Sequence, residues 1–130
     1  MAEIRRETAF KKLNALTYRS IENATLFCKM RRNPHVEVVH WLHVLVQEPD
    51  SDLWRLVRRF EIDDSRLATD LTRALERLDR GAAHVEDFSR ELELLIERAW
   101  VYSSLLFGHA KIRSGHLLYA LLQPELRPAF

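Results

Sequence analysis

Apolar residues in the first quarter of the chain recur at spacings of three and four. The positions that follow this spacing run from Leu13 to Phe27, and a repeat of about 3.6 residues is the signature of an amphipathic helix. We therefore expect one long helix from about Thr8 to Met30. The residue before a proline is kept out of the α region, so Pro34 should mark the end of this helix.

The rest of the chain carries the same helical spacing between capping and helix-ending residues. No segment shows the period-two alternation that is typical of a strand. These signals predict an all-α fold of about six to eight helices. The expected starts and stops are a short helix from Val38 closed by Pro49, a helix capped within Asp50–Asp52, a helix capped within Asp63–Ser65 and ended by Gly81, a connection over 82–88, a long helix capped by Ser89 and stopped by Gly108, and a short helix capped by Ser114 and ended at Gln123–Pro124.

One pattern occurs twice in the chain. The segment HWLHVLV (His40–Val46) returns as HLLYALL (His116–Leu122), 76 residues later. Carried back at the same offset without a gap, the alignment places Leu16 on Leu92. Two copies with so long a period fit two half-domains related by a pseudo-two-fold axis better than a solenoid. A duplicated helical module of this kind usually binds a partner.

Length, charge and cysteine content narrow the possible functions. Twenty basic residues against nineteen acidic ones give a net charge of +1, so no general field attracts nucleic acid or an anionic membrane. No apolar run approaches the roughly 20 residues of a membrane span, and the first seven residues are too charged for a signal peptide. Cys28 is the only cysteine. We expect a soluble, cytoplasmic single domain, divided as a first repeat with an N-terminal extension in 1–88 and a second repeat in 89–130 of the full 1–130.

Catalytic motifs are missing from the sequence. The glycines at 81, 108 and 115 begin neither a phosphate-binding loop nor a dinucleotide fingerprint. We therefore expect no catalytic residues, no ATPase activity and no cofactor in this segment.

Histidine is the one residue type that calls for a test as a metal ligand. His40 and His43 lie one helical turn apart, and His35 precedes them. A zinc site needs three or four convergent ligands. However, His116 matches His40 in the repeat, which favours a structural role such as hydrogen bonding near the helix start or across the contact between the half-domains. Both interpretations stay open at this point, although we expect no metal.

The duplicated short helices resemble those of a known family. HLLYALL is a near-complete match to the short-helix motif of the N-terminal domain of Clp/Hsp100 AAA+ unfoldases, and LWRLVRRFEID (Leu53–Asp63) is similar to that family's segment after the first repeat. Within the family, the sequence is most similar to the ClpV group of type VI secretion unfoldases. The segments that carry this similarity are KLN (Lys12–Asn14), QEPDSDL (Gln47–Leu53) and FGHAKIRSGHLL (Phe107–Leu118).

The resemblance implies a recognition function. It implies that the domain binds an N-terminal helix of a VipB-like protein of the contracted secretion sheath, and delivers it to the ATPase ring for disassembly. We expect that ring to follow Phe130 in an intact, hexameric parent, while the domain itself is monomeric. Helix-in-groove binding of micromolar affinity, strengthened by avidity, is the expected mode. Two alternatives remain: a general Clp N-domain that binds other adaptors or unfolded substrates, and a histidine-based metal site.

The expected groove runs along the first helix and is walled by the connection before the second repeat. Too many apolar residues share the first helix for all to face one core, so part of this strip should be exposed. Phe88 is the expected anchor, and the small residues would let a partner helix approach closely. The competing interpretation is that the extension Ile4–Phe10 covers the strip and that Phe88 packs into the core. The predicted partner-binding residues are Phe10, Leu13, Leu16, Thr17, Ser20, Ile21, Ala24, Val85, Phe88 and Leu92.

Overall fold

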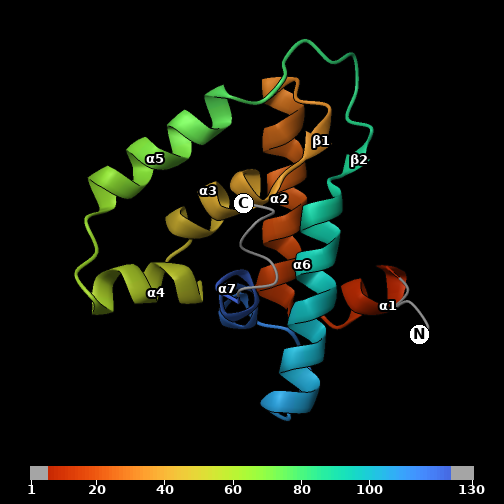
Figure 1. The fold of residues 1–130 in the computed structure, drawn as a ribbon, viewed down its shortest axis with the longest axis vertical. Helices are drawn as coiled ribbons and strands as arrows, with labels where there is room; N and C mark the ends of the chain where they lie inside the picture. The colour runs from red at the N-terminus through yellow and green to blue at the C-terminus, as the bar shows by residue number, and fades with distance from the viewer. Residues whose placement is uncertain (1–5, 124–130) are drawn as a thin grey trace.

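The computed structural model describes residues 6–123 and shows a predominantly helical fold (Figure 1). The predicted all-α class is confirmed. A parallel pair of two-residue strands was not predicted, because two residues are too few to show alternation. The elements are α1 (Arg6–Lys11), α2 (Ala15–Arg31), β1 (His35–Val36), α3 (Val38–Gln47), α4 (Asp52–Arg59), α5 (Asp64–Glu76), β2 (Asp87–Phe88), α6 (Arg90–Val101), a π-helical turn η1 (Tyr102–Leu106) and α7 (Ser114–Leu121).

The long first helix predicted from Thr8 to Met30 is wrong, because the chain breaks between α1 and α2. Asn14 has an extended backbone and caps α2, its side-chain oxygen accepting a hydrogen bond from the Thr17 amide at 2.9 Å. Satisfying one of the free amides at a helix start is the usual role of such a residue. Leu13 lies in the break and forms a parallel bridge with Ile112. The apolar spacing continues across the break, so the spacing alone did not reveal it.

The core is formed by two pairs of helices, in which α2 packs against α3 and α6 packs against α7. α1 contacts α6 on one side, and α4 bridges α3 and α7. The long helices α2 and α6 run along the vertical axis of Figure 1, while α4 and α5 project to its left. The largest fully buried side chains come from both pairs and include Trp41, Leu45, Leu92, Leu95, Ile96, Ile112 and Leu117.

The two repeats exchange backbone contacts in a reciprocal way. The Ser89 amide, just before α6, donates to the Val36 carbonyl, just before α3, at 2.9 Å. In the same manner the Asn14 amide, just before α2, donates to the Ile112 carbonyl, just before α7, at 2.9 Å. Each repeat therefore ties the start of its own short helix to the start of the other repeat's long helix, as expected for a pseudo-two-fold arrangement.

The ungapped offset of 76 holds for the short helices but not for the long ones. Ala24 and Ala99, which are 75 apart, are both fully buried. The Cys28 thiol donates to the carbonyls of Asn33 and His35, and the Ser103 hydroxyl, also 75 further on, donates to those of His109 and Lys111. The extra residue of the second repeat thus lies after Ser103, within η1. A π-helical turn is the ordinary way for a helix to absorb one inserted residue.

Several predicted helix ends need correction while others are confirmed. Ser51, Asp63 and Ser89 cap α4, α5 and α6 as predicted. Ser114 does not cap α7: the N-cap is Arg113, and the Ser114 hydroxyl instead accepts a hydrogen bond from the Asp52 amide at 2.9 Å. Gly81 does not end α5, which stops at Glu76. α7 ends at Leu121, and Pro124 lies outside the described residues.

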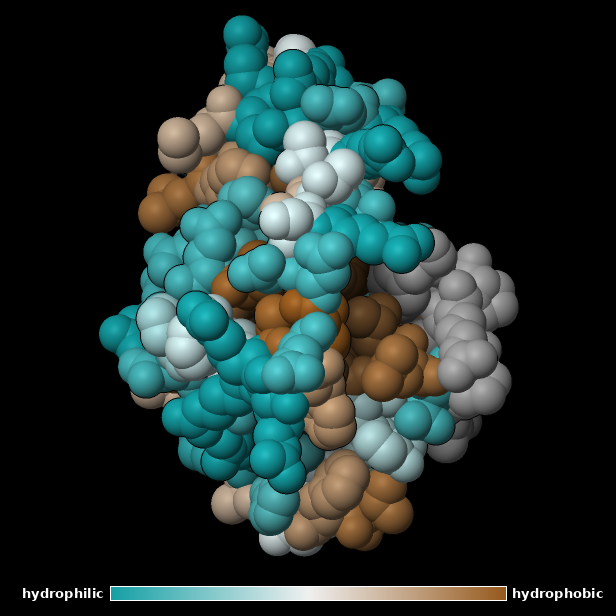
Figure 2. Space-filling model, turned by 90° about the vertical axis from the view of Figure 1, so that its left-hand side faces the viewer, coloured by the Kyte–Doolittle hydropathy of each residue, from teal (hydrophilic) through white to brown (hydrophobic). Residues whose placement is uncertain are grey.

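Exposed apolar side chains gather in separate places. Figure 2 shows the side of the molecule that carries α4 and α5, with apolar residues in a central hollow and at the lower end. Leu105 and Leu106, at the end of η1, and Phe107, directly after it, are exposed. No helix within residues 6–123 is long and apolar enough to cross a membrane.

Candidate partner-binding groove

An apolar groove runs along the outer face of α2. It consists of two hollows with volumes of about 380 Å³ and about 230 Å³, which adjoin because both are lined by Thr25 and Phe88. α2 forms one side, while α1 and the connection that ends in β2 form the other. We call this feature the α2 groove, and its lining residues are Glu7, Phe10, Tyr18, Ile21, Glu22, Thr25, Leu26, Lys29, Val36, His84, Val85, Asp87 and Phe88.

Phe88 stands at the middle of the groove, held there by the pairing of two short strands. β1 and β2 are parallel, with Val36 paired to Phe88. The half-buried Phe88 ring lies 5.3 Å, centroid to centroid, from the ring of Phe10 on α1. Aromatic pairs in this distance range are mutually attractive. The two rings therefore make a continuous apolar wall from the β1–β2 pair to α1.

The α2 side of the groove offers exposed apolar surface. Tyr18 is 46% exposed and Leu26 is 58% exposed, and they lie two turns apart on the helix. Between them, the Thr25 hydroxyl donates to the Ile21 carbonyl at 3.0 Å, so its hydrogen-bonding need is met within the helix. An apolar strip bounded by polar residues is typical of an interaction surface.

The ten predicted site residues fall into three groups. Phe10, Ile21, Val85 and Phe88 line the α2 groove, although Ile21 is only 3% exposed and forms its floor. Leu16 lies on a different face of α2, in a small hollow shared with Val44 of α3. The others were predicted to line the groove and do not: Leu13, Thr17, Ser20, Ala24 and Leu92 are buried.

The small residues of α2 are buried because they receive the chain's own helices. The Ser20 hydroxyl donates to the Thr17 carbonyl and accepts a hydrogen bond from the Trp41 indole, both at 2.6 Å. Ala24 has no exposed surface. Small side chains let helices pack closely, but here the space is filled from within the domain. Their predicted role of admitting a partner helix is therefore wrong.

On α2, the sequence analysis missed a stripe of groove residues that lies one step around the helix. Tyr18, Glu22, Leu26 and Lys29 form a stripe with spacings of four, four and three. This stripe mixes apolar, acidic and basic residues, so it reads as a solvated face. Only the position of α1 and of the connection beside it turns this stripe into a groove.

The histidines do not converge. The His40 Nδ1 accepts a hydrogen bond from the Glu37 amide at 2.8 Å, and its Nε2–H donates to the Asn33 side chain at 2.9 Å. Burial, followed by the charges of Arg31 and His43, lowers the pKa of His40 to about 4. Both of its ring nitrogens are occupied as a neutral imidazole, which leaves no lone pair for a metal.

The neighbouring histidines have other contacts. The His43 ring stacks on Phe27 at 4.3 Å, and the His35 Nε2 lies 3.7 Å from a Glu86 carboxylate oxygen. Among residues 6–123 no group of three His, Cys, Asp or Glu side chains is placed to hold a metal ion. The structural interpretation of His40, hydrogen bonding near the start of its helix, is confirmed.

Comparison with known proteins identifies the family to which this chain belongs. The family model for the Clp repeat (R) N-terminal domain matches residues 12–129. The chain belongs to this family. The AAA+ ATPase ClpV1 of Pseudomonas aeruginosa is 52% identical over 99% of the chain, and the chaperone protein ClpB of Yersinia enterocolitica is 49% identical over 97% of it. This Clp N-terminal domain spans 14% of the length of each of these two relatives.

A solved complex of a ClpV N-domain with a VipB peptide is also similar. It shares 28% identity and a TM-score of 0.87 with this chain, over 98% of this chain and 78% of the other. The likeness to ClpV that the sequence motifs indicated is thus confirmed, and so is the Clp N-domain fold.

Proposed function

We propose that this domain is the substrate-recognition domain of a ClpV-type AAA+ ATPase of type VI secretion. It binds a helix of a VipB-like sheath protein in the α2 groove, so that the ATPase ring can disassemble contracted sheaths. The observation that carries the proposal is the groove itself, where the Phe10–Phe88 wall faces the exposed Tyr18 and Leu26. The solved complex of a similar ClpV N-domain with a VipB peptide supports it.

The dimensions of the groove suit an amphipathic helix. A helix presents apolar residues every three or four positions along one face, and such a face fits a groove with apolar anchors. Tyr18 and Leu26 are eight residues apart on α2, which corresponds to about 12 Å of helix rise. Two turns of a bound helix would cover this distance. A contact of that size gives modest affinity, which a hexameric parent would strengthen through avidity.

The test compares two exposed leucines. Leu26 lies in the groove and is 58% exposed, while Leu105 lies at the far end of the α6–η1 helix and is 83% exposed. We would measure binding of a synthetic peptide covering the N-terminal helix of the VipB-type protein by calorimetry. Leu26→Arg should weaken binding at least tenfold and Leu105→Arg should leave it unchanged. Phe88→Ala should also weaken binding, since loss of an aromatic anchor commonly costs about 2 kcal/mol or more.

Circular dichroism and thermal melting of each variant show that the fold is retained. Because Leu26 is an exposed helical residue, the Leu26→Arg variant is the one expected to fold normally. If that variant binds the peptide as well as the wild-type domain does, the α2 groove is not the binding site.

A general Clp N-domain is the second candidate, favoured by the similarity to a protein named ClpB. Such a domain would bind unfolded polypeptides through its apolar surfaces. Competition distinguishes the two: an excess of reduced, unfolded lactalbumin should not displace the sheath peptide under the first proposal, and should displace it under the second.

The remaining properties follow from the same assignment. We infer that the domain acts without a cofactor and without turnover of ATP, that it is monomeric, and that its parent works in the cytoplasm as a hexamer. An ATPase assay and sedimentation of the isolated domain test the absence of ATP turnover and the monomeric state.

A further inference from the structure

The charged residues that line the α2 groove are sorted by sign along its length. The hollow next to α1 contains Glu7 and Glu22, and the residues that line it include no basic side chain. The hollow next to the β1–β2 pair contains Lys29 together with Asp87. Glu22 and Lys29 lie on the same face of α2, separated by about 10 Å of helix rise. The groove is therefore acidic at one end and carries its cation at the other.

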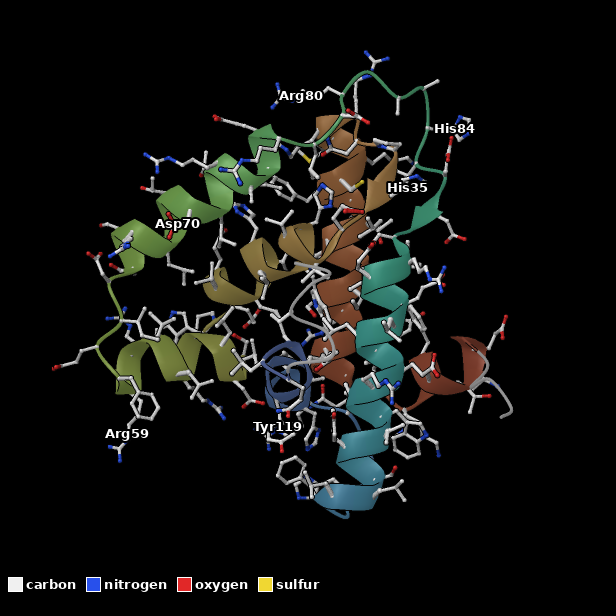
Figure 3. All side chains as sticks on the ribbon, in the orientation of Figure 1. His35, Arg59, Asp70, Arg80, His84 and Tyr119 are labelled. Atoms are coloured by element: carbon white, nitrogen blue, oxygen red, sulfur yellow. The ribbon has the colours of Figure 1, made fainter. Side chains whose placement is uncertain are left out.

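The Lys29 end also contains carboxylates, which oppose the charge of Lys29. The Asp87 carboxylate accepts a hydrogen bond from the Phe88 amide at 2.8 Å, and the Glu86 carboxylate lies 3.7 Å from His35. His84, on the connection that leads to β2, also lines this end (Figure 3). Lys29 is exposed on the helix that forms the opposite side. Among the lining residues, the α1 end therefore has two carboxylates and no ammonium group, while the Lys29 end has one of each, so the α1 end is the more acidic.

The charge difference between the two ends of the groove acts on the partial charges at the ends of a bound helix. The first turn of a helix has free amides and a partial positive charge, while the last turn has free carbonyls and a partial negative charge. Carboxylates favour the first turn and ammonium groups favour the last, each by about two- to fivefold in an equilibrium at low salt. Among the lining residues, Glu7, Glu22 and Lys29 act in the same sense and are opposed by Asp87 alone, so one direction of binding is preferred.

We infer that the partner helix binds in the α2 groove in one direction, an inference that rests on the proposed function. The N-terminal end of the bound helix lies over Glu7 and Glu22, its C-terminal end lies beside Lys29, and it runs parallel to α2. The same sorting makes the groove selective for a partner that carries lysine or arginine on the N-terminal half of its apolar helix. Apolar contacts with Phe10 and Phe88 hold the helix in the groove. The three charged side chains determine the direction in which it lies.

Nuclear magnetic resonance with spin-labelled peptides tests the direction. The probe is the synthetic VipB-type peptide, made once with a nitroxide at its N-terminus and once with a nitroxide at its C-terminus. The N-terminal label should broaden the amide signals of Glu7, Tyr18 and Glu22. The C-terminal label should broaden those of Lys29 and Val85. The reverse pattern, or equal broadening from both labels, would overturn the inference.

Charge reversal tests the cause. At low salt, Glu22→Lys should weaken peptide binding about two- to fivefold, and Lys29→Glu should do the same, because each reverses one favourable contact with a helix end. Both effects should shrink in 0.5 M salt, where the screening length is only a few ångströms. Asp70→Lys is the matched control for Glu22→Lys, since it makes the same charge change on the exposed face of α5, away from the groove (Figure 3). Equal effects of Glu22→Lys and Asp70→Lys, with an opposite effect of Lys29→Glu, would show that net charge alone matters, and would overturn the inference.

A charge exchange completes the test. A peptide whose basic residue nearest its N-terminus is replaced by glutamate should bind the Glu22→Lys domain better than it binds the wild-type domain. Failure of the wild-type domain to bind any form of the peptide would overturn the proposed function together with the direction. Binding that is lost in Leu26→Arg, with the reversed broadening pattern, would overturn the direction alone.

Discussion

His40 and His116 hold equivalent positions in the two repeats and make the same pair of hydrogen bonds. The Nδ1 of each accepts from the backbone amide three residues earlier, at 2.8 Å for Glu37 and 2.9 Å for Arg113. The Nε2 of each lies 2.9 Å from a side chain seven residues earlier, Asn33 in the first repeat and His109 in the second. Each imidazole thus caps its helix start and links it to the preceding turn, provided that it stays neutral.

Acid should destabilise the domain through these imidazoles. The pKa of His40 is lowered from 6.5 to about 4, mainly by burial, and the pKa of His116 is lowered by burial and by the charge of His109. Between pH 6.5 and about pH 4 the unfolded chain takes up a proton at His40 and the folded chain does not. The free energy of unfolding therefore falls as the pH falls from about 6.5. His40 alone accounts for about 3 kcal/mol at most. Urea denaturation between pH 7.5 and 4.5 measures the slope.

Two carboxyl groups modify this slope. Burial and the charge of Glu91 raise the pKa of Glu37, so Glu37 adds stability as the pH falls. Hydrogen bonds from Arg113 and Gly115 outweigh burial and lower the pKa of Asp52. The contribution of Asp52 to the stability of the domain therefore decreases as the pH falls. The His40→Asn variant separates the histidine contribution: it should be less stable at pH 7.5, and its stability should depend less on pH. An unchanged slope in this variant would assign the acid sensitivity to other groups.

Asp52 should matter more for stability than its ion-pair partner. Its carboxylate accepts hydrogen bonds from the Gly115 amide at 2.8 Å and from the Arg113 guanidinium at 2.9 Å, while its own amide donates to Ser114. This contact fixes the start of α4 to the start of α7. Asp52→Ala leaves a partly buried amide without its acceptor and should cost about 1–3 kcal/mol. The Arg113 side chain is 53% exposed, so Arg113→Ala should cost under about 1 kcal/mol. Denaturation midpoints of the two variants give the comparison, and equal losses would contradict it.

The helix caps before α2 and α6 should contribute equally. Asn14 and Ser89 each accept a hydrogen bond from the amide three residues later, at 2.9 and 3.1 Å. Replacing either by alanine should destabilise the domain by about 1 kcal/mol, whereas Asn14→Asp and Ser89→Asp should keep most of that stability. A negligible loss for Asn14→Ala would mean that the backbone hydrogen bonds of Lys12 and Asn14 to Ile112 fix the break without the cap. Thermal melting of the four variants is sufficient.

Much of the fold could be predicted from the sequence because each helix that builds the core buries one face. The caps at Ser51, Asp63 and Ser89 are local signals, and they were found. The break at Asn14 was missed, although a capping residue marks it. Ala9 before the break and Thr17 after it are both buried, so the apolar spacing looks continuous. Hydrophobic periodicity cannot reveal a break between two helices when the buried positions on its two sides keep a helical spacing.

The groove was predicted in place but only in part by residue. Phe88 was named because a large apolar side chain is unusual in a connection, and Val85 because the repeat register places its segment just before Leu92. The α2 side was placed on Thr17, Ser20 and Ala24, which the core covers. Which face of α2 remains open depends on where α1 packs after the break, and that is decided by contacts distant in sequence. The one-residue shift between the long helices was also hidden, because each offset aligns some like residues: the offset of 76 places Leu16 on Leu92, while that of 75 places Ala24 on Ala99.

A final prediction concerns the π-helical turn η1. It tests whether this turn only accommodates an inserted residue or is required for the fold. If η1 only absorbs the extra residue of the second repeat, deletion of Leu105 should give an ordinary α-helical end like that of α2. Leu105 is 83% exposed and contributes little packing. Ser103 lies before the deletion and His116 after it, so both keep their positions. The deletion should change stability by no more than about 1–2 kcal/mol, within the range of ordinary single substitutions.

Deletion of Glu97 from the middle of α6 is the matched control. It removes one residue from the same continuous helix, but it rotates everything that follows by about 100° relative to the core. Ala99 and Ser103, both fully buried, would turn away from their contacts, and the domain should lose cooperative unfolding. Thermal melting and the dispersion of amide signals in both deletion variants decide the matter. Comparable damage from the two deletions would show that the wider turn at η1 positions the segment before α7, and that it is required for the fold.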